Sequence, residues 1–222
     1  MPEKKEILRV KGEIKKTYAK VSKSYSIWEG RFERKLRERA LKFLDVQEGE
    51  IVLEIGFGTG FTLVEIAKSV GERSKAYGID VTHEMVELAK ERLKREELAG
   101  RVELSEGDAR NMPYEDNMFD AVYMVGVLEL FDTPDIPKVL KDIKRVLKPD
   151  GRLVVASIEK EGHENSKFLR LYEWVHRKFP KIASCRPIYV EDSIRDAGYK
   201  TIKTDEMMLS KLFPMKFVVA ST

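Results

Sequence analysis

Residues 51–60 constrain the fold of this chain more than any other stretch. The run Ile51-Val52-Leu53-Glu54-Ile55 is short, apolar and rich in β-branched residues, as expected of a buried strand. Glycines follow at positions 56, 58 and 60, and apolar residues resume at helical spacing from position 61. Glycine adopts positive φ without steric cost and lets a ligand lie directly on the backbone. A strand, a glycine-rich turn and a helix in this order predict the first unit of a doubly wound nucleotide-binding sheet.

The rest of the chain continues the alternation of strands and helices. Further strands are predicted at 75–79, 101–104, 119–125 and 152–156, with helices at 61–70, 83–97 and 133–147. Alternation through five strands predicts an α/β fold with a parallel sheet and right-handed crossovers. The pattern then changes to helices at 166–179 and 191–197 and two final strands at 199–204 and 215–221. We expect one domain, residues 45–222, preceded by an N-terminal helical arm, residues 1–44.

The predicted arm is basic. Residues 1–42 contain 14 Lys and Arg against 6 Glu, whereas the remainder contains 27 Lys and Arg against 32 acidic residues. Tyr18, Tyr25 and Trp28 precede a helix predicted to end at residue 44. Two interpretations remain open. The arm is either a solvated helix that packs on the domain edge, or a lid whose aromatic residues close over the ligand while its lysines face an anionic substrate or a membrane surface.

Composition excludes several classes of protein. No apolar run approaches the roughly 20 residues of a membrane-spanning helix, and the N-terminus has no apolar signal segment, so we expect a cytoplasmic protein. The single Cys185 excludes an internal disulfide, and histidines at 83, 163 and 176 lack metal-ligand spacing, so no metal site is expected. Charged residues make up 36% of the chain, while Gln occurs once and Asn three times, a composition that suggests a thermophile.

The glycine loop by itself leaves several ligands open. A dinucleotide-binding G-x-G-x-x-G sequence would need a third glycine where the chain has Phe61, and a P-loop would need a lysine at the helix start. The remaining pattern is Glu54-x-Gly56-x-Gly58-x-Gly60, in which the acidic residue precedes the glycines. That arrangement suits a cationic ligand better than a pyrophosphate. S-adenosylmethionine, which has an amino group, a sulfonium and no phosphate, fits it.

Over residues 46–157 the chain resembles the class I S-adenosylmethionine-dependent methyltransferases. Asp80 ends the second predicted strand about 20 residues after the glycines, where the family places a carboxylate on the ribose hydroxyls. Asp108 matches the family's acceptor for the adenine amino group, with the Ala109 N–H near a ring nitrogen. The resemblance implies a Rossmann-like, doubly wound sheet of seven strands, mostly parallel with an antiparallel last strand.

Two further hallmarks of the family support the resemblance, and together they define an expected cofactor site. Phe119-Asp120 opens the fourth predicted strand, and residues 147–153 (LKPDGRL) precede and enter the fifth. Phe57 stands where the family often has a small residue, so its side chain is expected to point away from the ligand. Met85 is expected to touch adenine, with core packing as the alternative. The expected cofactor-binding residues are Glu54, Gly56, Phe57, Gly58, Gly60, Asp80, Val81, Met85, Asp108, Ala109 and Val125.

The methyl acceptor is expected to bind beyond the fourth predicted strand. Acceptor sites in the family lie in the positions of residues 125–131, the aromatic arm and residues 168–179. Residues 125–131 contain neither an Asn/Asp-Pro-Pro-Tyr/Phe motif nor a Pro-Cys motif, which disfavours amino-directed base methylation and C5 methylation of pyrimidines. The chain is most similar to ubiquinone/menaquinone C-methyltransferases and phospholipid N-methyltransferases. A small-molecule or lipid-like acceptor is therefore expected, and peripheral membrane contact is compatible with it.

Three residues are candidate catalytic bases by position: Glu129, His163 and His176. For each of these three residues the alternative is a surface or packing role. For Asp80 the alternative to ligand binding is capping of the following helix. The product of methyl transfer would be S-adenosylhomocysteine. Other functions remain open, namely an RNA methyltransferase that binds phosphates with the basic arm, a non-catalytic cofactor-binding homologue and a nicotinamide oxidoreductase, which Phe61 argues against. No feature of the sequence indicates an oligomeric state.

Overall fold

The computed structural model describes residues 34–179, 184–209 and 212–222. Most of the expected arm, with Tyr18, Tyr25 and Trp28, lies outside the described residues. The described part begins with α2 (Arg34–Leu44). This helix buries Leu36, Ala40 and Leu44, and these side chains belong to the core that covers one face of the sheet. The last helix of the arm therefore packs on the domain.

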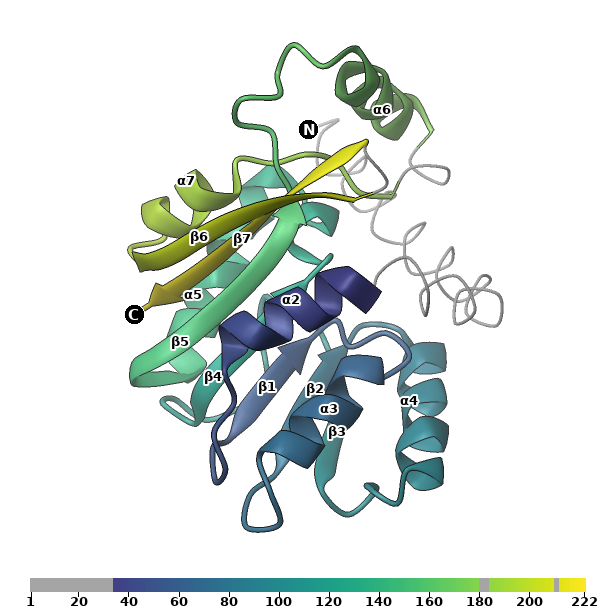
Figure 1. Ribbon diagram of the computed structural model, residues 1–222, viewed down its shortest axis with the longest axis vertical. Helices are drawn as coiled ribbons and strands as arrows, with labels where there is room; N and C mark the ends of the chain where they lie inside the picture. Colours follow the sequence, from purple (N-terminus) through teal and green to yellow (C-terminus); the bar gives the residue numbers. More distant parts are fainter. Residues whose placement is uncertain (1–33, 180–183, 210–211) are drawn as a thin grey trace.

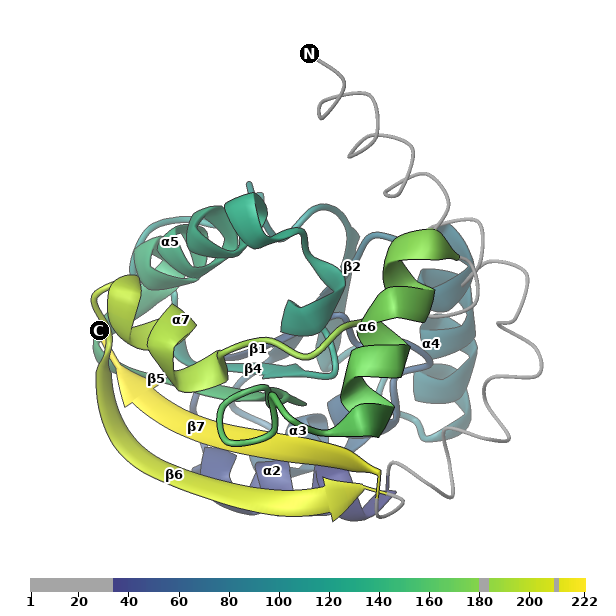
Figure 2. The same cartoon turned by 90° about the horizontal axis from the view of Figure 1, so that it is seen from above.

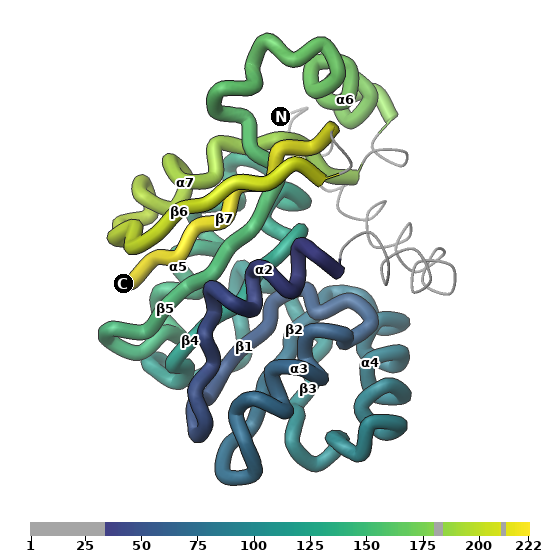
Figure 3. The backbone as a smooth tube through the Cα atoms, viewed as in Figure 1, coloured from purple at the N-terminus to yellow at the C-terminus, as the bar shows by residue number. Residues whose placement is uncertain are grey.

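Seven strands form one sheet in the described part of the chain (Figure 1). They are β1 (Val52–Ile55), β2 (Ala76–Asp80), β3 (Val102–Glu106), β4 (Phe119–Val125), β5 (Leu147–Ile158), β6 (Lys200–Leu209) and β7 (Phe213–Ser221). Their order is β3-β2-β1-β4-β5-β7-β6. The first five strands are parallel, and β7 runs antiparallel to both β5 and β6 (Figure 3). The predicted seven-stranded Rossmann-like sheet, mostly parallel with an antiparallel last strand, is confirmed.

Helices cover both faces of the sheet. On one face lie α2, α3 (Phe61–Ser69) and α4 (His83–Arg95), and on the other lie α5 (Ile136–Val146) and α7 (Val190–Asp196) (Figure 1). Two short 3-10 turns, η1 (Leu128–Leu130) and η2 (Thr133–Asp135), connect β4 to α5. The remaining helix, α6 (Lys167–Lys178), lies beyond the carboxyl ends of the parallel strands (Figures 1 and 2). No helix among the described residues is both long and apolar enough to cross a membrane.

The sheet separates two hydrophobic cores. Consecutive residues of β4 alternate between them: Tyr123 belongs to the core that contains residues of α2, α3 and α4, whereas Val122 and Met124 belong to the core that contains residues of α5 and α7. All four residues of β1 are buried, as expected for a parallel strand covered on both faces. Each fully buried aliphatic or aromatic side chain stabilises the fold by about 1.5–3 kcal/mol relative to exposure. Burial of both faces thus holds the carboxyl ends of the strands in place.

The structure differs from the predicted elements in the last third of the chain. Strand β5 begins at Leu147, although residues 148–151 were expected to form a turn before a strand at 152–156. These residues bulge out of the strand, because the β4–β5 register shifts there and Asp150 adopts a φ of 65°. Strands β6 and β7 are also longer than the predicted 199–204 and 215–221, since they pair with each other over almost their whole length. The residue patterns within each strand do not predict this pairing between β6 and β7.

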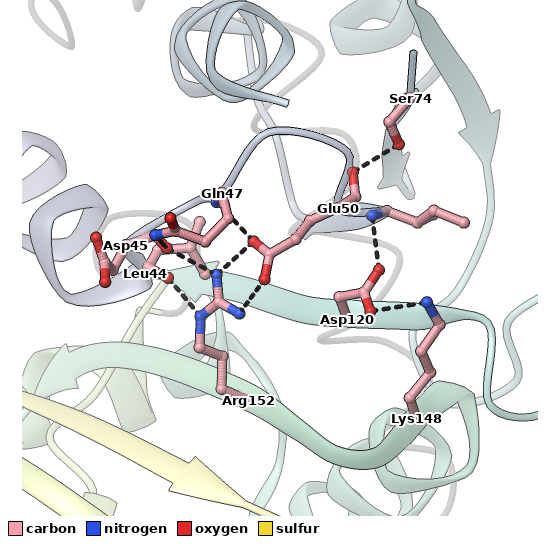
Figure 4. Close-up of polar contacts among 9 residues, drawn as sticks. Leu44, Asp45, Gln47, Glu50, Ser74, Asp120, Lys148 and Arg152 are labelled. Carbon is pink, nitrogen blue, oxygen red and sulfur yellow. Dashed lines mark hydrogen bonds and ion pairs between the residues drawn. The ribbon is translucent and has the colours of Figure 1, made fainter. Parts of the chain in front are cut away.

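A polar cluster connects segments at the amino ends of the strands (Figure 4). The glycine loop follows β1 and so lies at the opposite edge of the sheet. Arg152 donates from both terminal nitrogens to Glu50, at 2.7 and 2.6 Å, and also to the backbone oxygens of Leu44 and Asp45. Asp120 accepts from the backbone N–H of Ile51 at 2.8 Å and from Lys148 Nζ at 2.7 Å. Asp120, Lys148 and Arg152 belong to the two hallmark segments of the sequence. In this structure those segments therefore have a structural role.

Candidate functional site

The loop after β1 requires glycine for both its conformation and its packing. Gly56, Gly58 and Gly60 have φ values of 69°, 52° and 80°, in the left-handed region that other residues rarely adopt. A Cβ atom at Gly56 would lie 2.4 Å from Cγ2 of Val127, in the segment that follows β4. At Gly60 it would lie 2.9 Å from Cβ of Ala89. The loop is therefore confined between the end of β4 and helix α4.

Phe57, the departure from the family pattern, points into the core. Its side chain is buried and lies against Gly78 of β2, where a Cβ atom would come within 2.7 Å of the Phe57 ring. The backbone of Phe57 stays in the loop, and its carbonyl oxygen accepts from the N–H of Gly60 at 2.9 Å. The large ring therefore fills space inside the domain and leaves the surface of the loop clear.

Asp80 joins the glycine loop to the end of β2. Its Oδ2 atom accepts from the backbone N–H of Gly58 at 3.1 Å, and its Oδ1 atom accepts from the N–H of Thr82 at 2.9 Å. Thr82 is the N-cap of α4, so this bond holds the residue that precedes the helix, and the Thr82 side chain makes no capping hydrogen bond. Asp80 is 9% exposed, and burial raises the pKa of its carboxyl group. Val81 beside it is 45% exposed and presents an apolar surface next to the acid.

Two other expected cofactor residues are buried in the protein. Met85, in the first turn of α4, is 2% exposed, in agreement with the core-packing alternative. Glu54, the acid before the glycines, is 4% exposed within β1, which pairs with β2 and β4. Contact of either residue with a ligand stays a prediction.

Asp108 has a partner that the sequence did not reveal. Arg110 donates from Nε to both carboxylate oxygens, at 2.8 and 3.0 Å, and from Nη1 to Asp135 at 2.8 Å. These contacts, chiefly the one with Asp108, raise the pKa of the arginine above its usual range. The arginine thus fixes the acid against the start of α5. A ligand amino group at Asp108 would share the carboxylate with Arg110.

The expected cofactor residues meet at one edge of the sheet. The glycine loop follows β1, Asp80 and Val81 follow β2, Asp108 and the buried Ala109 follow β3, and Val125 ends β4. Strands β1 and β4 are neighbours at the point where the strand order reverses, and ligands of open α/β sheets bind outside the carboxyl ends at such points. The part of the chain described in the structure contains no cluster of three His, Cys, Asp or Glu suited to a metal ion.

The three candidate bases lie in different environments. Glu129, in η1, is 4% exposed and accepts from Ser157 Oγ at 2.6 Å. Burial raises its pKa to about 7, although hydrogen bonds from Ser157 and from the backbone N–H of Ile158 act in the opposite direction. His176, on α6, lines a cavity, whereas His163 lies in the loop before α6 and is not part of that cavity's lining.

The cavity has a volume of about 800 Å³ and lies between α6 and the segments that follow β4 and β5. Its lining comes from regions far apart in the sequence, so no local pattern predicted it beyond the assignment of residues 168–179 to the acceptor side. The lining residues are Asp132, Lys160, Arg170, Leu171, Glu173, Trp174, His176, Arg177 and Arg186.

Comparisons with known proteins agree with this geometry. A family described as a methyltransferase domain matches residues 52–151. Demethylmenaquinone methyltransferase from Bacillus pumilus is 31% identical, over 86% of this chain and 90% of that protein. The corresponding protein from Lactobacillus johnsonii is 34% identical over 156 residues, and there the chain spans only 62% of the relative's length.

Solved structures extend the likeness to three dimensions. A SAM-dependent methyltransferase from Aquifex aeolicus superposes with a TM-score of 0.66 at 26% identity, over 89% of this chain and 97% of that one. The glycine loop, the acid at the end of β2 and the strand order agree with this likeness. The chain belongs to the class I S-adenosylmethionine-dependent methyltransferases.

Proposed function

We propose that the protein transfers a methyl group from S-adenosylmethionine to a small-molecule or lipid-like acceptor. The observation that carries the proposal is the bond between Gly58 and Asp80, which places a glycine cradle and a carboxylate side by side at the reversal point of the sheet. Relatives named demethylmenaquinone methyltransferases support a small, lipid-like acceptor. The single Cys185 agrees with a cytoplasmic location.

The residues of the site fit the cofactor. Without side chains, Gly56 and Gly60 let the loop lie directly against Val127 and Ala89, and the Asp80 carboxylate beside the loop would accept from the ribose hydroxyls. Val81 offers an apolar face for the adenine, and Asp108 an acceptor for its amino group. When bound, the cofactor supplies an activated methyl group on a sulfonium. The protein's contribution is then chiefly orientation, which is worth up to about 7–11 kcal/mol in favourable cases.

On the acceptor side, Glu129 is the residue best placed to take a proton. A pKa of about 7 leaves this carboxyl group partly ionised near neutral pH, the condition in which a general base is most effective. It lies in the segment after β4, and Ser157 at the end of β5 fixes its orientation. Transfer of the methyl group to an aromatic carbon forms a C–C bond and releases a ring proton, so an acceptor of the hydroquinone type would need such a base.

Two measurements test the proposal. Calorimetry with S-adenosylhomocysteine and NAD determines the cofactor: we expect saturable binding of the former and none of the latter. A labelled-methyl assay against cell extract, separated into lipid, RNA, protein and soluble fractions, then identifies the acceptor class. We expect label in the lipid or soluble fraction. Label confined to RNA would favour the nucleic-acid alternative, and cofactor binding without transfer to any fraction would favour a non-catalytic homologue.

A further inference from the structure

The cavity beneath α6 has an excess of positive charge in its lining. Four basic side chains, Lys160, Arg170, Arg177 and Arg186, face two acidic ones, Asp132 and Glu173. Lys160 is already paired, since its Nζ atom lies 2.6 Å from Glu173 Oε1. The rest of the lining therefore has three guanidinium groups, those of Arg170, Arg177 and Arg186, and a single carboxylate, that of Asp132. Like charges gathered in a concave site raise the local concentration of anions.

Arg186 is the least accessible of the three arginines. Its Nη2 atom donates to the carbonyl oxygen of Phe131 and to Thr133 Oγ1, both at 3.0 Å, and both of these partners are neutral. Burial lowers its pKa, while the charges of Asp132, Glu173 and Glu129 act to raise it. A guanidinium has five N–H donors in a rigid fork, so Arg186 retains donors beyond the two bonds that it makes in the described residues.

Arg170 and Arg177 stand two turns apart on α6, on the side of the helix that lines the cavity. Both are exposed, and neither forms an ion pair with any residue in the described ranges 34–179, 184–209 and 212–222. Leu171 and Trp174 lie between them in the same lining and are 58% and 45% exposed. The helix thus presents cationic and apolar groups to one cavity.

We propose that this cavity binds a phosphate or diphosphate group of the methyl acceptor, with Arg186, Arg170 and Arg177 as its cationic contacts. Leu171 and Trp174 then contact the apolar part of the same molecule. The inference rests on the proposed function, because it treats the cavity as part of the acceptor site. Guanidinium groups match phosphate oxygens in bidentate geometry, and three of them favour a multiply charged anion over a single carboxylate.

Trp174 provides a direct readout of binding. The chain has two tryptophans, so Trp28→Phe leaves Trp174 as the only one. We would titrate this variant with inorganic diphosphate at constant ionic strength and follow the Trp174 emission. A saturable change is expected, and in Arg170→Gln/Arg177→Gln the Kd should rise by at least about tenfold. Arg195→Gln/Lys141→Gln is the matched control, because it removes the same charge from α7 and α5 and should leave the Kd within about twofold.

A second arm separates an acceptor-borne phosphate from free phosphate. Hexyl phosphate should bind several-fold more tightly than inorganic phosphate, and Leu171→Ser should remove most of that advantage. Equal affinities for the two probes would contradict the proposal that the anion belongs to an amphiphilic acceptor. No saturable emission change, or an equal Kd in the arginine variant and the charge-matched control, would overturn the anion site itself.

Failure of this inference can be distinguished from failure of the proposed function. S-adenosylhomocysteine binding, measured by calorimetry, is assigned to the glycine loop and Asp80 and to none of the three arginines. If S-adenosylhomocysteine binds but diphosphate does not, the cavity assignment is wrong and the methyltransferase assignment stands. If S-adenosylhomocysteine does not bind, the proposed function itself fails.

Discussion

The backbone N–H of Gly58 donates to Oδ2 of Asp80 at 3.1 Å, so the loop after β1 and the end of β2 are directly connected. The second carboxylate oxygen is held by the N–H of Thr82, at the start of α4. These two bonds fix the direction of the acid without using all of its acceptor sites, since an ionised carboxylate has about four lone-pair positions. A structural role for Asp80 and a ribose-binding role are therefore compatible.

Asp80→Asn should weaken S-adenosylhomocysteine binding by at least tenfold. The substitution keeps the side-chain volume but removes the charge from two hydrogen bonds to hydroxyls, each worth about 1.5–3 kcal/mol when charge-assisted. Calorimetry measures the affinity, and thermal unfolding checks that the fold is retained. Asp192→Asn, on the exposed surface of α7, is the control and should bind as the unaltered protein does. Equal affinities in the two variants would show that the ribose assignment is wrong.

The fold, and the edge of the sheet at which the cofactor is proposed to bind, could be predicted from the sequence because both depend on local patterns. The glycine loop, Asp80 and Asp108 each follow a strand that is recognisable from its own residues, and carboxyl ends of parallel strands necessarily share an edge. The contact between Asp135 and Arg110 could not be predicted, since Arg110 lies 25 positions earlier in the chain. The lining of the cavity could not be predicted for the same reason, because Arg186 contacts Phe131, which lies 55 positions earlier.

Gly56→Ala should cost more stability than Gly49→Ala, although both glycines have positive φ. At Gly49 a Cβ atom would meet nothing within 4 Å, so only the backbone cost of roughly 1–2 kcal/mol applies. At Gly56 the new atom also collides with Val127, which must move together with the segment after β4. Urea unfolding should show a further loss of about 1 kcal/mol or more for Gly56→Ala.

The same pair of variants tests the position of the cofactor site. S-adenosylhomocysteine affinity should fall in Gly56→Ala and stay unchanged in Gly49→Ala, because residue 49 lies at the opposite end of β1. Adding Val127→Ala to Gly56→Ala should restore part of the lost stability by removing the nearest atoms. If Gly56→Ala and Gly49→Ala lose the same stability, the collision with Val127 does not contribute to the cost of Gly56→Ala.

Glu129→Gln should change the dependence of stability on pH. Burial raises the folded-state pKa of Glu129 from 4.5 to about 7, so between these values the folded protein binds this proton more tightly than the unfolded chain does. Stability associated with this group is therefore present below pH 4.5 and is lost as the pH rises through about 7. Glutamine cannot ionise and still accepts from Ser157.

Relative to the unaltered protein, the Glu129→Gln variant should gain on the order of 2–3 kcal/mol between pH 5 and pH 8. Urea unfolding of both proteins at the two pH values measures this difference, and other titrating groups cancel in the comparison. A difference in unfolding free energy that is the same at pH 5 and pH 8 would show that Glu129 is already ionised at pH 5.

The charge-rich composition suggests a protein from a thermophile, and its melting temperature tests that expectation. Ion pairs join elements in groups: Arg145, for example, contacts both Asp142 and Asp116, and Arg110 contacts Asp108 and Asp135. Networks of this kind contribute more at high temperature because the desolvation penalty of charges falls. Calorimetric unfolding should give a melting temperature above the range of about 45–65 °C typical of mesophilic domains. A value within that range would exclude the thermophile assignment.

Arg152→Met should destabilise the domain without affecting the cofactor site. The substitution removes a guanidinium that is 22% exposed, its bonds to Glu50 and its bonds to the carbonyl groups of Leu44 and Asp45. Glu50, 18% exposed, would remain as a carboxylate without its main partner, at a cost of about 2–3 kcal/mol in urea unfolding at pH 7. Arg195→Met, which breaks an exposed pair on α7, should cost less than about 1 kcal/mol.

The pH dependence of the stability loss in Arg152→Met identifies the cause of that loss. Burial alone would raise the pKa of Glu50, but hydrogen bonds from Arg152 and from the N–H of Gln47 outweigh it and hold the pKa below 4.5. The stabilisation is therefore present above pH 4.5 and is lost as the pH falls through the folded-state pKa. The difference between Arg152→Met and the unaltered protein should accordingly narrow below pH 4.5. A difference that stays constant into acid would attribute the loss to packing of the arginine stem, and S-adenosylhomocysteine affinity should be unchanged at pH 7 in either case.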